Sequence, residues 1–350
     1  MNIVSVDLGY GYIKAVSSNG KKVLFPSLVG RGHDRTLSGL FYSPNNDLTE
    51  CHFKINGEHY FIGELAKRES STSTRIFEQD RYTHEYTRIL LNAAIQLVSD
   101  ENVVRLVTGL PLDFYQSQAK EVKSKIQGIY PELEWVSGPL GKVNRKISVE
   151  QALVFPQGAG AILSALLSEQ LTPVYPELME AGVKVGLVDI GFRTTDYIVV
   201  EMQGKGMFKP LPNLSGTIDN VGVNNLYKDI LRAYKDMTGG ADLKEEYIDR
   251  IIRQKMIKFR GQPLKFHHVI ESSLSGTCTR MVDVLKLAWA NDLDLLDAVF
   301  IAGGGGELYY PYLNPHFNHQ LQKVEDSQFA NATGYLKLGR AMWQTAEAAG

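Results

Sequence analysis

Two segments of the chain join an aspartate to a glycine-containing turn, a combination suited to holding a phosphate and its counterion. The first reads Asp7-Leu8-Gly9-Tyr10-Gly11-Tyr12-Ile13-Lys14, and the second reads Asp189-Ile190-Gly191-Phe192-Arg193-Thr194-Thr195-Asp196. Glycine lets the backbone turn tightly and point its N–H groups outward, so that they form an anion-binding concavity. Each aspartate ends an apolar run at the mouth of its turn, where a carboxylate can hold a hydrated Mg²⁺.

Polar side chains beside these glycines add hydrogen-bond donors. Lys14 could reach a β-phosphate oxygen, and Thr194 and Thr195 offer hydroxyl groups. Arg193 could touch phosphate, although solvent exposure is commoner, and Asp196 could approach the metal or ribose or cap its own turn. An ordinary glycine turn with a solvated lysine stays open as the alternative for the first segment. The predicted nucleotide contacts in the two turns are Gly9, Tyr10, Gly11, Lys14, Gly191, Phe192, Arg193, Thr194 and Thr195.

A third segment places four consecutive glycines after an apolar strand. It reads Phe300-Ile301-Ala302-Gly303-Gly304-Gly305-Gly306-Glu307. Glycines that open a helix permit close backbone approach to a ring or ribose and leave a helix N-terminus beside phosphate. Glycine runs also occur in plain loops, but four glycines after a strand and before a helix that begins at Glu307 favour a ligand. Its predicted contacts are Gly303, Gly304, Gly305 and Glu307.

The elements that must position these residues begin alike in the two halves of the chain. Val6–Tyr10 and Val188–Phe192 share an apolar–Asp–apolar–Gly–aromatic pattern, which predicts two related strand–turn–strand units. Residues 31–80 are polar and indicate an irregular insertion. Periodicity and turn residues predict strands at 2–7, 12–17, 22–25, 103–108, 183–189, 195–201 and 298–302 and helices at 84–99, 114–127, 159–167, 222–236, 242–258, 266–290 and 329–346.

Composition limits the class of protein. A length of 350 residues predicts two domains, and a net charge of −2 gives no basic excess for binding DNA or an anionic membrane directly. Cys51 and Cys278 stand far apart and are expected to be buried free thiols in a reducing compartment. No apolar run approaches membrane-spanning length. We therefore expect a soluble, cytoplasmic protein with no membrane partner.

Taken in order, the three segments resemble the two phosphate motifs and the adenosine motif of the actin, sugar-kinase and heat-shock-chaperone superfamily. Phe155-Pro156-Gln157 resembles the first connecting motif, in which Gln or Glu positions the attacking water, and 328–335 is similar to the helix that returns to the first lobe. Within the superfamily the chain most resembles ParM/StbA-type plasmid-segregation actins and small archaeal actin-like proteins. The segments that carry this closer resemblance are 7–14, 25–27, 108–115, 156–158, 189–196 and 328–335. Gln157 departs from the Glu of plasmid ParM patterns.

The resemblance implies an α/β, actin-like (ribonuclease H-like) fold of two domains with a nucleotide cleft between the lobes. Domain I would span 1–165 and 325–350, with an insertion subdomain at about 31–80. Domain II would span 166–324, with a helical subdomain at about 238–292. The ligand would be ATP, or GTP because glycine backbones accept either purine, together with Mg²⁺. Asp7 and Asp189 would hold the metal through water, and Gln157 would orient the attacking water in a slow hydrolysis. A structural Gln157 at a helix start is the alternative.

The function that the resemblance implies is a filament that assembles with ATP, disassembles after hydrolysis and drives plasmid DNA segregation. Its partners would be further copies of the chain and a DNA-bound adaptor protein, without direct binding of nucleic acid. A basic stretch could form a filament contact, although a solvated helix face is more common: Arg250, Arg253, Lys255, Lys258, Arg260 and Lys265, followed by His267 and His268. The alternative is a small-molecule kinase that acts on a sugar or acid. Asp113 would then be the base, unless it caps the following helix.

Overall fold

The computed structural model of the chain describes residues 2–35, 47–74, 82, 84–204, 207–318 and 320–348. Its internal contacts form two compact units. Unit 1 comprises Met1–Leu163 and Asn331–Gly350, and unit 2 comprises Ser164–Ala330. Compactness alone does not define a functional domain, so the predicted domains and the helical subdomain at 238–292 stay predictions.

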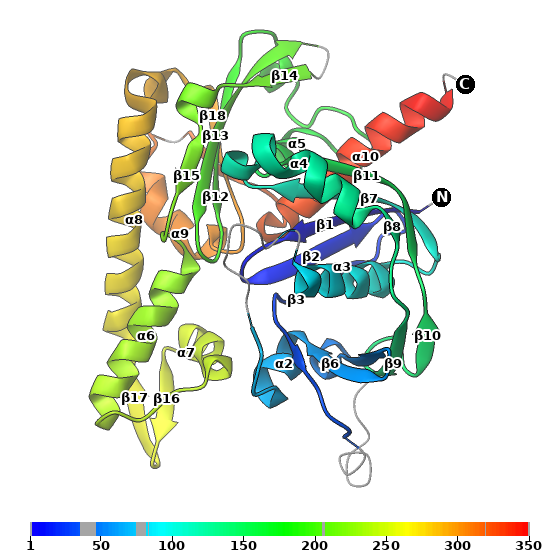
Figure 1. The fold of residues 1–350 in the computed structure, drawn as a ribbon. Helices are drawn as coiled ribbons and strands as arrows, with labels where there is room; N and C mark the ends of the chain where they lie inside the picture. Colours follow the sequence, from blue (N-terminus) through cyan, green and yellow to red (C-terminus); the bar gives the residue numbers. More distant parts are fainter. Residues whose placement is uncertain are drawn as a thin grey trace. The chain divides into compact units, whose positions relative to one another are not determined.

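Unit 1 is built on a mixed sheet with the strand order β3-β2-β1-β7-β11-β8 (Figure 1). Strands β1, β2 and β3 pair antiparallel, whereas β1 pairs parallel with β7 and β7 parallel with β11. The strands are β1 Asn2–Leu8, β2 Tyr12–Ser17, β3 Lys22–Pro26, β7 Val103–Leu110, β8 Gly128–Ile129 and β11 Ser148–Pro156. The helices are α3 Glu85–Val98, α4 Leu112–Ile126, α5 Ala159–Leu166, which crosses into unit 2, and α10 Ala330–Ala348, which returns from it.

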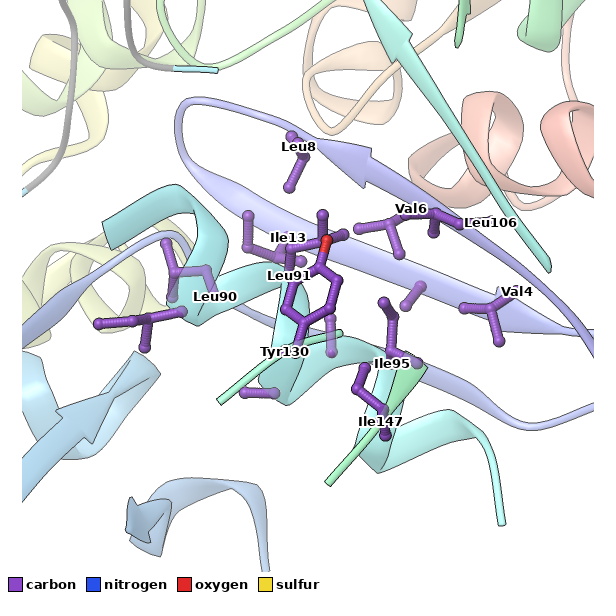
Figure 2. Packing of buried hydrophobic residues seen from close by; sticks show 14 of the residues in the cluster. Val4, Val6, Leu8, Ile13, Leu90, Leu91, Ile95, Leu106, Tyr130 and Ile147 are labelled. Carbon is purple, nitrogen blue, oxygen red and sulfur yellow. The ribbon is translucent and has the colours of Figure 1, made fainter. Parts of the chain in front are cut away.

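The two faces of β1 carry different side chains because successive residues of a strand point to opposite sides. Val4, Val6 and Leu8 are buried in the cluster that includes Leu91 and Ile95 of α3 (Figure 2). On the alternate positions, the Ser5 hydroxyl donates to the Ala332 carbonyl of α10 (2.6 Å). The alternation that buries the apolar residues therefore puts Asp7 in the same set as Ser5, on the α10 side.

Unit 2 repeats this sheet. Its strand order is β14-β13-β12-β18-β19, with β15 added to β13. The strands are β12 Lys184–Ile190, β13 Thr195–Gly204, β14 Met207–Pro210, β15 Gly216–Ile218, β18 Ala298–Ala302 and β19 Leu321–Lys323. The helices are α6 Val223–Thr238, α7 Ile248–Gln254, α8 His267–Trp289 and α9 Gly306–Leu313.

The two sheets match residue by residue at their first hairpin. In unit 1 Asp7 pairs with Lys14 and Leu8 with Ile13, and in unit 2 Asp189 pairs with Asp196 and Ile190 with Thr195. The first strand of each sheet then pairs parallel with the fourth, since β1 lies on β7 and β12 lies on β18. The similar sequences at the two starts therefore correspond to one repeated sheet, with its aspartate in the same register.

The prediction that residues 31–80 are irregular is wrong for most of the described part. A second sheet in unit 1 has the order β10-β9-β5-β6-β4, and helix α2 follows β6. Its elements are β4 Val29–Arg31, β5 His52–Ile55, β6 Glu58–Ile62, α2 Gly63–Glu69, β9 Leu133–Ser137 and β10 Val143–Arg145. Long-range pairing of β5 with β9 completes this sheet, and local composition does not show such a partner. Residues 36–46 and 75–80 of the predicted insertion lie outside the described residues.

The helix predicted over 242–258 is also shorter than expected. Helix α7 ends at Gln254 because Lys255 adopts a left-handed conformation (φ 57°). A hairpin follows, made of β16 Met256–Phe259 and β17 Gln262–Lys265 and closed through Gly261 (φ 81°). The basic stretch therefore lies mainly on a hairpin and not on a helix face. Short 3-10 helices are η1 Leu48–Glu50, η3 Pro176–Met179, η4 Pro212–Leu214, η5 Glu245–Tyr247, η6 Ala290–Leu295, η7 Asn314–His316 and η8 Ser327–Phe329.

Both cysteines are buried free thiols, as predicted. Burial raises the pKa of the Cys51 thiol to about 12 and that of the Cys278 thiol to about 11. Each is therefore protonated at neutral pH and behaves as a small apolar side chain. None of the described helices is long and apolar enough to cross a lipid bilayer.

Helices α5 and α10 cross through glycines. A Cβ on Gly334 would overlap the carbonyl oxygen of Gly160, and a Cβ on Gly160 would lie 2.8 Å from the Asn331 carbonyl oxygen. The same helix ends are tied by a side chain, because Oδ1 of Asn331 accepts from the N–H groups of Gly158 (3.0 Å) and Ala161 (3.3 Å). Because Gly160 and Gly334 have no side chain, the backbones of α5 and α10 can come into close contact. These are the helices in which the chain leaves unit 1 and returns to it.

We predict that Gly334→Ala destabilises the protein by about 1–3 kcal/mol, the usual cost of overpacking a close contact. The matched control is Gly276→Ala on α8, where no atom lies within 4 Å of the added Cβ, so that the higher helix propensity of alanine applies. Urea unfolding measures both variants. Equal stabilities of the Gly334→Ala variant and the wild-type protein would contradict the close crossing.

Candidate functional site

Asp7 ends the buried strand β1 and is compensated by two donors. Lys14 Nζ donates to Oδ2 of Asp7 (2.9 Å), and Gln157 Nε2 donates to Oδ1 (3.3 Å). Only 5% of the Asp7 side chain and 12% of the Lys14 side chain are exposed. The hairpin register supplies the lysine because residues 7 and 14 face each other across β1 and β2. Burial of the carboxylate is tolerated because both oxygens have polar partners.

The first turn has no room for a side chain at Gly9. A Cβ there would lie 2.6 Å from the Tyr12 carbonyl oxygen and 2.9 Å from Lys14 Nζ. Gly11 is buried, and its carbonyl accepts from the Ser27 N–H (2.9 Å), which ties the segment after β3 to the turn. Tyr10 is half-buried. The turn is therefore a fixed backbone structure beside the carboxylate.

Gln157 directs its side chain at Asp7. Its N–H donates to the Leu110 carbonyl (2.6 Å), and the next residue, Gly158, adopts φ 85°. The cap of α5 is supplied by Asn331, whose oxygen accepts from two N–H groups of the first turn. Gln157 lies two residues before α5, so a structural Gln157 at a helix start stays the alternative to the predicted role with water. The capping role of Asn331 went unpredicted, although the residue lies in a segment that the resemblance includes.

The second turn is closed by the start of helix α6. Gly191 N–H donates to the Thr194 carbonyl (2.9 Å), and a Cβ on Gly191 would lie 2.9 Å from the same oxygen. The carbonyls of Gly191 and Phe192 accept from the N–H groups of Val223 (3.1 Å) and Asn224 (2.7 Å). Asp189 is buried at the end of β12, as Asp7 is at the end of β1. The two turns share a buried aspartate and a glycine pressed against the carbonyl three residues later.

Two predicted side chains of the second turn are directed inward. The Thr195 hydroxyl is completely buried and donates to the Val221 carbonyl (2.9 Å). The ligand contact of Thr195 stays a prediction. Asp196 accepts from the Thr217 hydroxyl, which favours a structural role. Arg193 and Thr194 are half-buried, so full solvent exposure of Arg193 does not hold. Phe192 packs edge-on against Tyr227, with ring centroids 5.1 Å apart.

The glycine run joins the second turn within unit 2. A Cβ on Gly303 (φ 85°) would overlap Oδ1 of Asp189, and Gly305 N–H donates to the Ile190 carbonyl (2.9 Å). Gly304 is exposed and has only Gln328 Nε2 within 4 Å of its Cβ position, at 3.8 Å. Glu307 is exposed and pairs with Lys323 (3.2 Å). The structure thus brings Asp189, Gly303 and Gly305 together and leaves Glu307 on the surface.

The residues fit a hydrated cation better than a directly coordinated one. In the part of the chain that the structure describes, no three His, Cys, Asp or Glu side chains gather as metal ligands. The first turn has one buried carboxylate, Asp7, and the second has two, Asp189 and Asp196, of which Asp196 accepts from the Thr217 hydroxyl. Mg²⁺ keeps several waters and takes one or two carboxylates together with substrate phosphates, so Asp7 and Asp189 suit it only through water.

Two α/β units with the same sheet order, each with an aspartate and a glycine turn at the carboxyl end of its first strand, define a class of two-lobed α/β protein. Family models agree with this class. "Actin like proteins N terminal domain" matches residues 5–160, and "Archaeal actin homologue MreB-like, C-terminal" matches residues 187–314. The chain belongs to the actin-like proteins.

Relatives cover the whole length of the chain. An archaeal actin homolog of Thermoplasma volcanium is 26% identical over 349 residues, which are 96% of this chain and 98% of the relative. A ParM filament subunit from Clostridium botulinum is 29% identical with a TM-score of 0.86, covering 97% of this chain and 99% of that one. Ta0583, an archaeal actin homolog in complex with ADP, is 21% identical with a TM-score of 0.77, covering 97% and 100%. The predicted α/β, actin-like fold with two lobes is confirmed.

Substitutions at two adjacent glycines separate a structural role from a ligand contact. We predict that Gly303→Ala lowers stability, because its Cβ overlaps Asp189 and its φ is positive. Gly304→Ala should leave the melting temperature within about 2 °C and weaken ATP binding about tenfold, since its methyl group would project into exposed space. Thermal unfolding and titration with a fluorescent ATP analogue measure the two effects. If the Gly304→Ala variant binds the ATP analogue with the affinity of the wild-type protein, the glycine run is not part of the nucleotide site.

Proposed function

We propose that this actin-like protein binds ATP through the aspartate–glycine turns of both units, assembles into a filament and leaves it after slow hydrolysis. The observation that carries the proposal is the repeated hairpin, which buries Asp7 and Asp189 in the same register of two equivalent sheets. One turn alone would be an ordinary β-turn. Two equivalent turns supply the paired clamps that a triphosphate requires. The ADP complex of Ta0583 and the ParM filament of C. botulinum support this proposal by likeness.

The nucleotide would be held mainly by backbone N–H groups of the two turns and by Lys14. Asp7 and Asp189 would accept hydrogen bonds from waters around Mg²⁺, whose charge neutralises phosphate oxygens in phosphoryl transfer. Lys14 is paired with Asp7 in this structure, so it already lies at the turn where a phosphate would bind. Preference for ATP over GTP remains part of the proposal.

Gln157 would orient the water that attacks the γ-phosphate. An amide can align water but is a poor proton acceptor, so turnover below the roughly 1–100 s⁻¹ of kinases is expected. The amide also suits its neighbour, because Nε2 donates to Asp7 Oδ1 at 3.3 Å. A glutamate at this position would place a second carboxylate beside Asp7, and like charges would repel. Gln157 therefore avoids a second carboxylate beside Asp7.

We predict that Gln157→Ala reduces ATP hydrolysis at least tenfold while it changes ATP affinity less than threefold. The filament should then persist after assembly, since ATP-bound subunits accumulate. Phosphate release, nucleotide titration and pelleting after addition of ATP measure the three quantities, and Gln203→Ala provides a control on an exposed amide outside the predicted nucleotide contacts. An unchanged hydrolysis rate would sink the assigned role of Gln157.

Unit 2 offers two complementary surfaces for head-to-tail assembly. The hairpin β16–β17 precedes α8 and exposes Lys258, Arg260 and Lys265, and no acidic residue occurs from 250 to 270. The far end of this 23-residue helix leads to η6, where Leu295 is 65% exposed and Asp294 and Asp297 are exposed. The helix spans about 34 Å, so the two surfaces lie far apart. Contact between unlike surfaces of successive copies generates open filaments.

A charge exchange tests this contact. Lys258→Glu with Arg260→Glu should abolish ATP-dependent pelleting, and Asp294→Lys with Asp297→Lys should do the same. An equal mixture of the two double variants should pellet again as an alternating polymer, because every contact between unlike variants then joins opposite charges, and one chain with all four changes should also pellet. Light scattering and electron microscopy with ATP, beside an ADP control, distinguish these outcomes. Normal assembly of both double variants would exclude the contact.

Plasmid segregation would require an adaptor. The net charge of −2 gives the chain no general affinity for DNA, so a DNA-bound adaptor protein is proposed to connect the filament to its cargo. The kinase alternative gains nothing from the described residues. Asp113 is the second residue of α4, and its side chain lies outside the described residues. Turnover stimulated by a sugar or small acid, without pelleting, would favour the kinase instead.

A further inference from the structure

A groove of about 690 Å³ runs along helices α6 and α8 in unit 2. The two helices pack side by side (Figure 1) and run antiparallel. The Ser273 hydroxyl of α8 donates to Asp229 of α6 (2.7 Å), while Tyr309 of α9 bonds both Thr277 and the Gly222 carbonyl, which precedes α6. The middle of α8 thus faces the middle of α6, and its later part faces the start of α6.

The lining of the groove is basic. It includes Lys228 and Arg232 from α6 and His268 and Arg280 from α8, all of them exposed. Asp229 is the acidic residue of the lining, and it is already engaged by the Ser273 hydroxyl and by Arg232 at 3.6 Å. Among the described residues, Lys228 and Arg280 form no ion pair. Lys228 and Arg280 therefore present positive charge for which the described part of the chain supplies no ion-pair partner.

The floor of the groove is made of small residues and lies open. Gly276 sits in the middle of a 23-residue helix, where glycine costs about 1 kcal/mol relative to alanine. No atom lies within 4 Å of its Cβ position, so packing within the described chain does not explain the glycine. Ser272 and Thr277 flank it on the same lining. Because the floor residues are small, the backbone of a bound helix could approach α8 closely. Acidic side chains of that helix could then reach the basic side chains on both sides of the floor.

We propose that the α6–α8 groove is a docking site for an acidic helix of a partner protein. The stretch of α8 from His268 to Arg280 is about 18 Å long, which matches three turns of a helix laid along the pair. Such an occupant would set small residues over Gly276 and carboxylates against Lys228, Arg232 and Arg280. Helix-in-groove docking of this kind takes its specificity from the spacing of anchors. Charge complementarity selects the acidic partner.

The test uses the full-length chain without nucleotide and a fluorescein-labelled, helix-stapled peptide of 16 residues. Alanines occupy the face of the peptide helix that would contact the groove floor at Gly276. Glutamates occupy the two sides of that face. We expect micromolar binding by fluorescence anisotropy, weakened at least tenfold by Arg280→Glu, by Lys228→Glu and by Gly276→Leu, which fills the groove. The matched controls Lys286→Glu and Ser275→Leu change exposed positions of α8 outside the lining and should alter the affinity less than twofold.

Three results would overturn the proposal. One is no binding at 100 μM, and another is equal binding of the peptide with glutamine in place of glutamate. The third is equal displacement by inorganic tripolyphosphate at matched ionic strength, which would define a site for any polyanion. ATP-dependent pelleting of the same variants keeps this site separate from the proposed function. If the groove variants fail to pellet and the wild-type protein does not bind the peptide, the groove is a contact between copies of the chain. If the wild-type protein pellets with ATP, the filament proposal stands whatever the result of the peptide experiment.

Discussion

Burial of a carboxylate at the end of the first strand of each sheet is the constraint on which the rest of the site depends. An isolated buried charge is costly, so the surrounding residues must supply donors without enclosing the carboxylate completely. In unit 1 the lysine directly across the hairpin and the amide that follows β11 do this for Asp7. The arrangement needs the strand register and a close glycine turn, because a side chain at Gly9 would occupy the position of Lys14 Nζ.

Unit 2 buries its aspartate without a lysine across the hairpin. The residue opposite Asp189 is Asp196, which is itself bonded to Thr217. The glycine run at the end of β18 lies against Asp189, and its amides engage Ile190 and neighbouring carbonyls. The two units therefore repeat one sheet but surround their aspartates differently.

Glycines also shape the segment that joins Gln157 to helices α5 and α10. Gly158 ends β11 and opens α5 directly after Gln157, and Gly160 and Gly334 let α5 and α10 touch through their backbones. Asn331 fastens the same crossing by capping α5. A residue proposed to orient water thus sits next to the helices in which the chain leaves and re-enters unit 1. Movement of those helices would be transmitted to Gln157 over a very short distance.

Sequence by itself determined the elements with strong local signals. The strands that bear Asp7 and Asp189, the glycine turns and the helices at 85–98 and 267–289 follow from alternation, helical spacing and the freedom of glycine. The resemblance that joins these motifs in order then predicted the fold. Local pattern could not reveal which distant segments pair, so the sheet formed by β5 and β9 was missed.

The partners of individual side chains were decided only by the tertiary structure. Thr195 and Thr194 look equivalent in the sequence, yet the strand pleat turns the first into the core and leaves the second half-buried. Asn331 caps a helix that lies 170 residues away in the chain, and Gln157 reaches Asp7 across 150 residues. Spacing along a chain fixes the neighbours within one turn or strand, whereas contacts of this range depend on how complete sheets and helices pack.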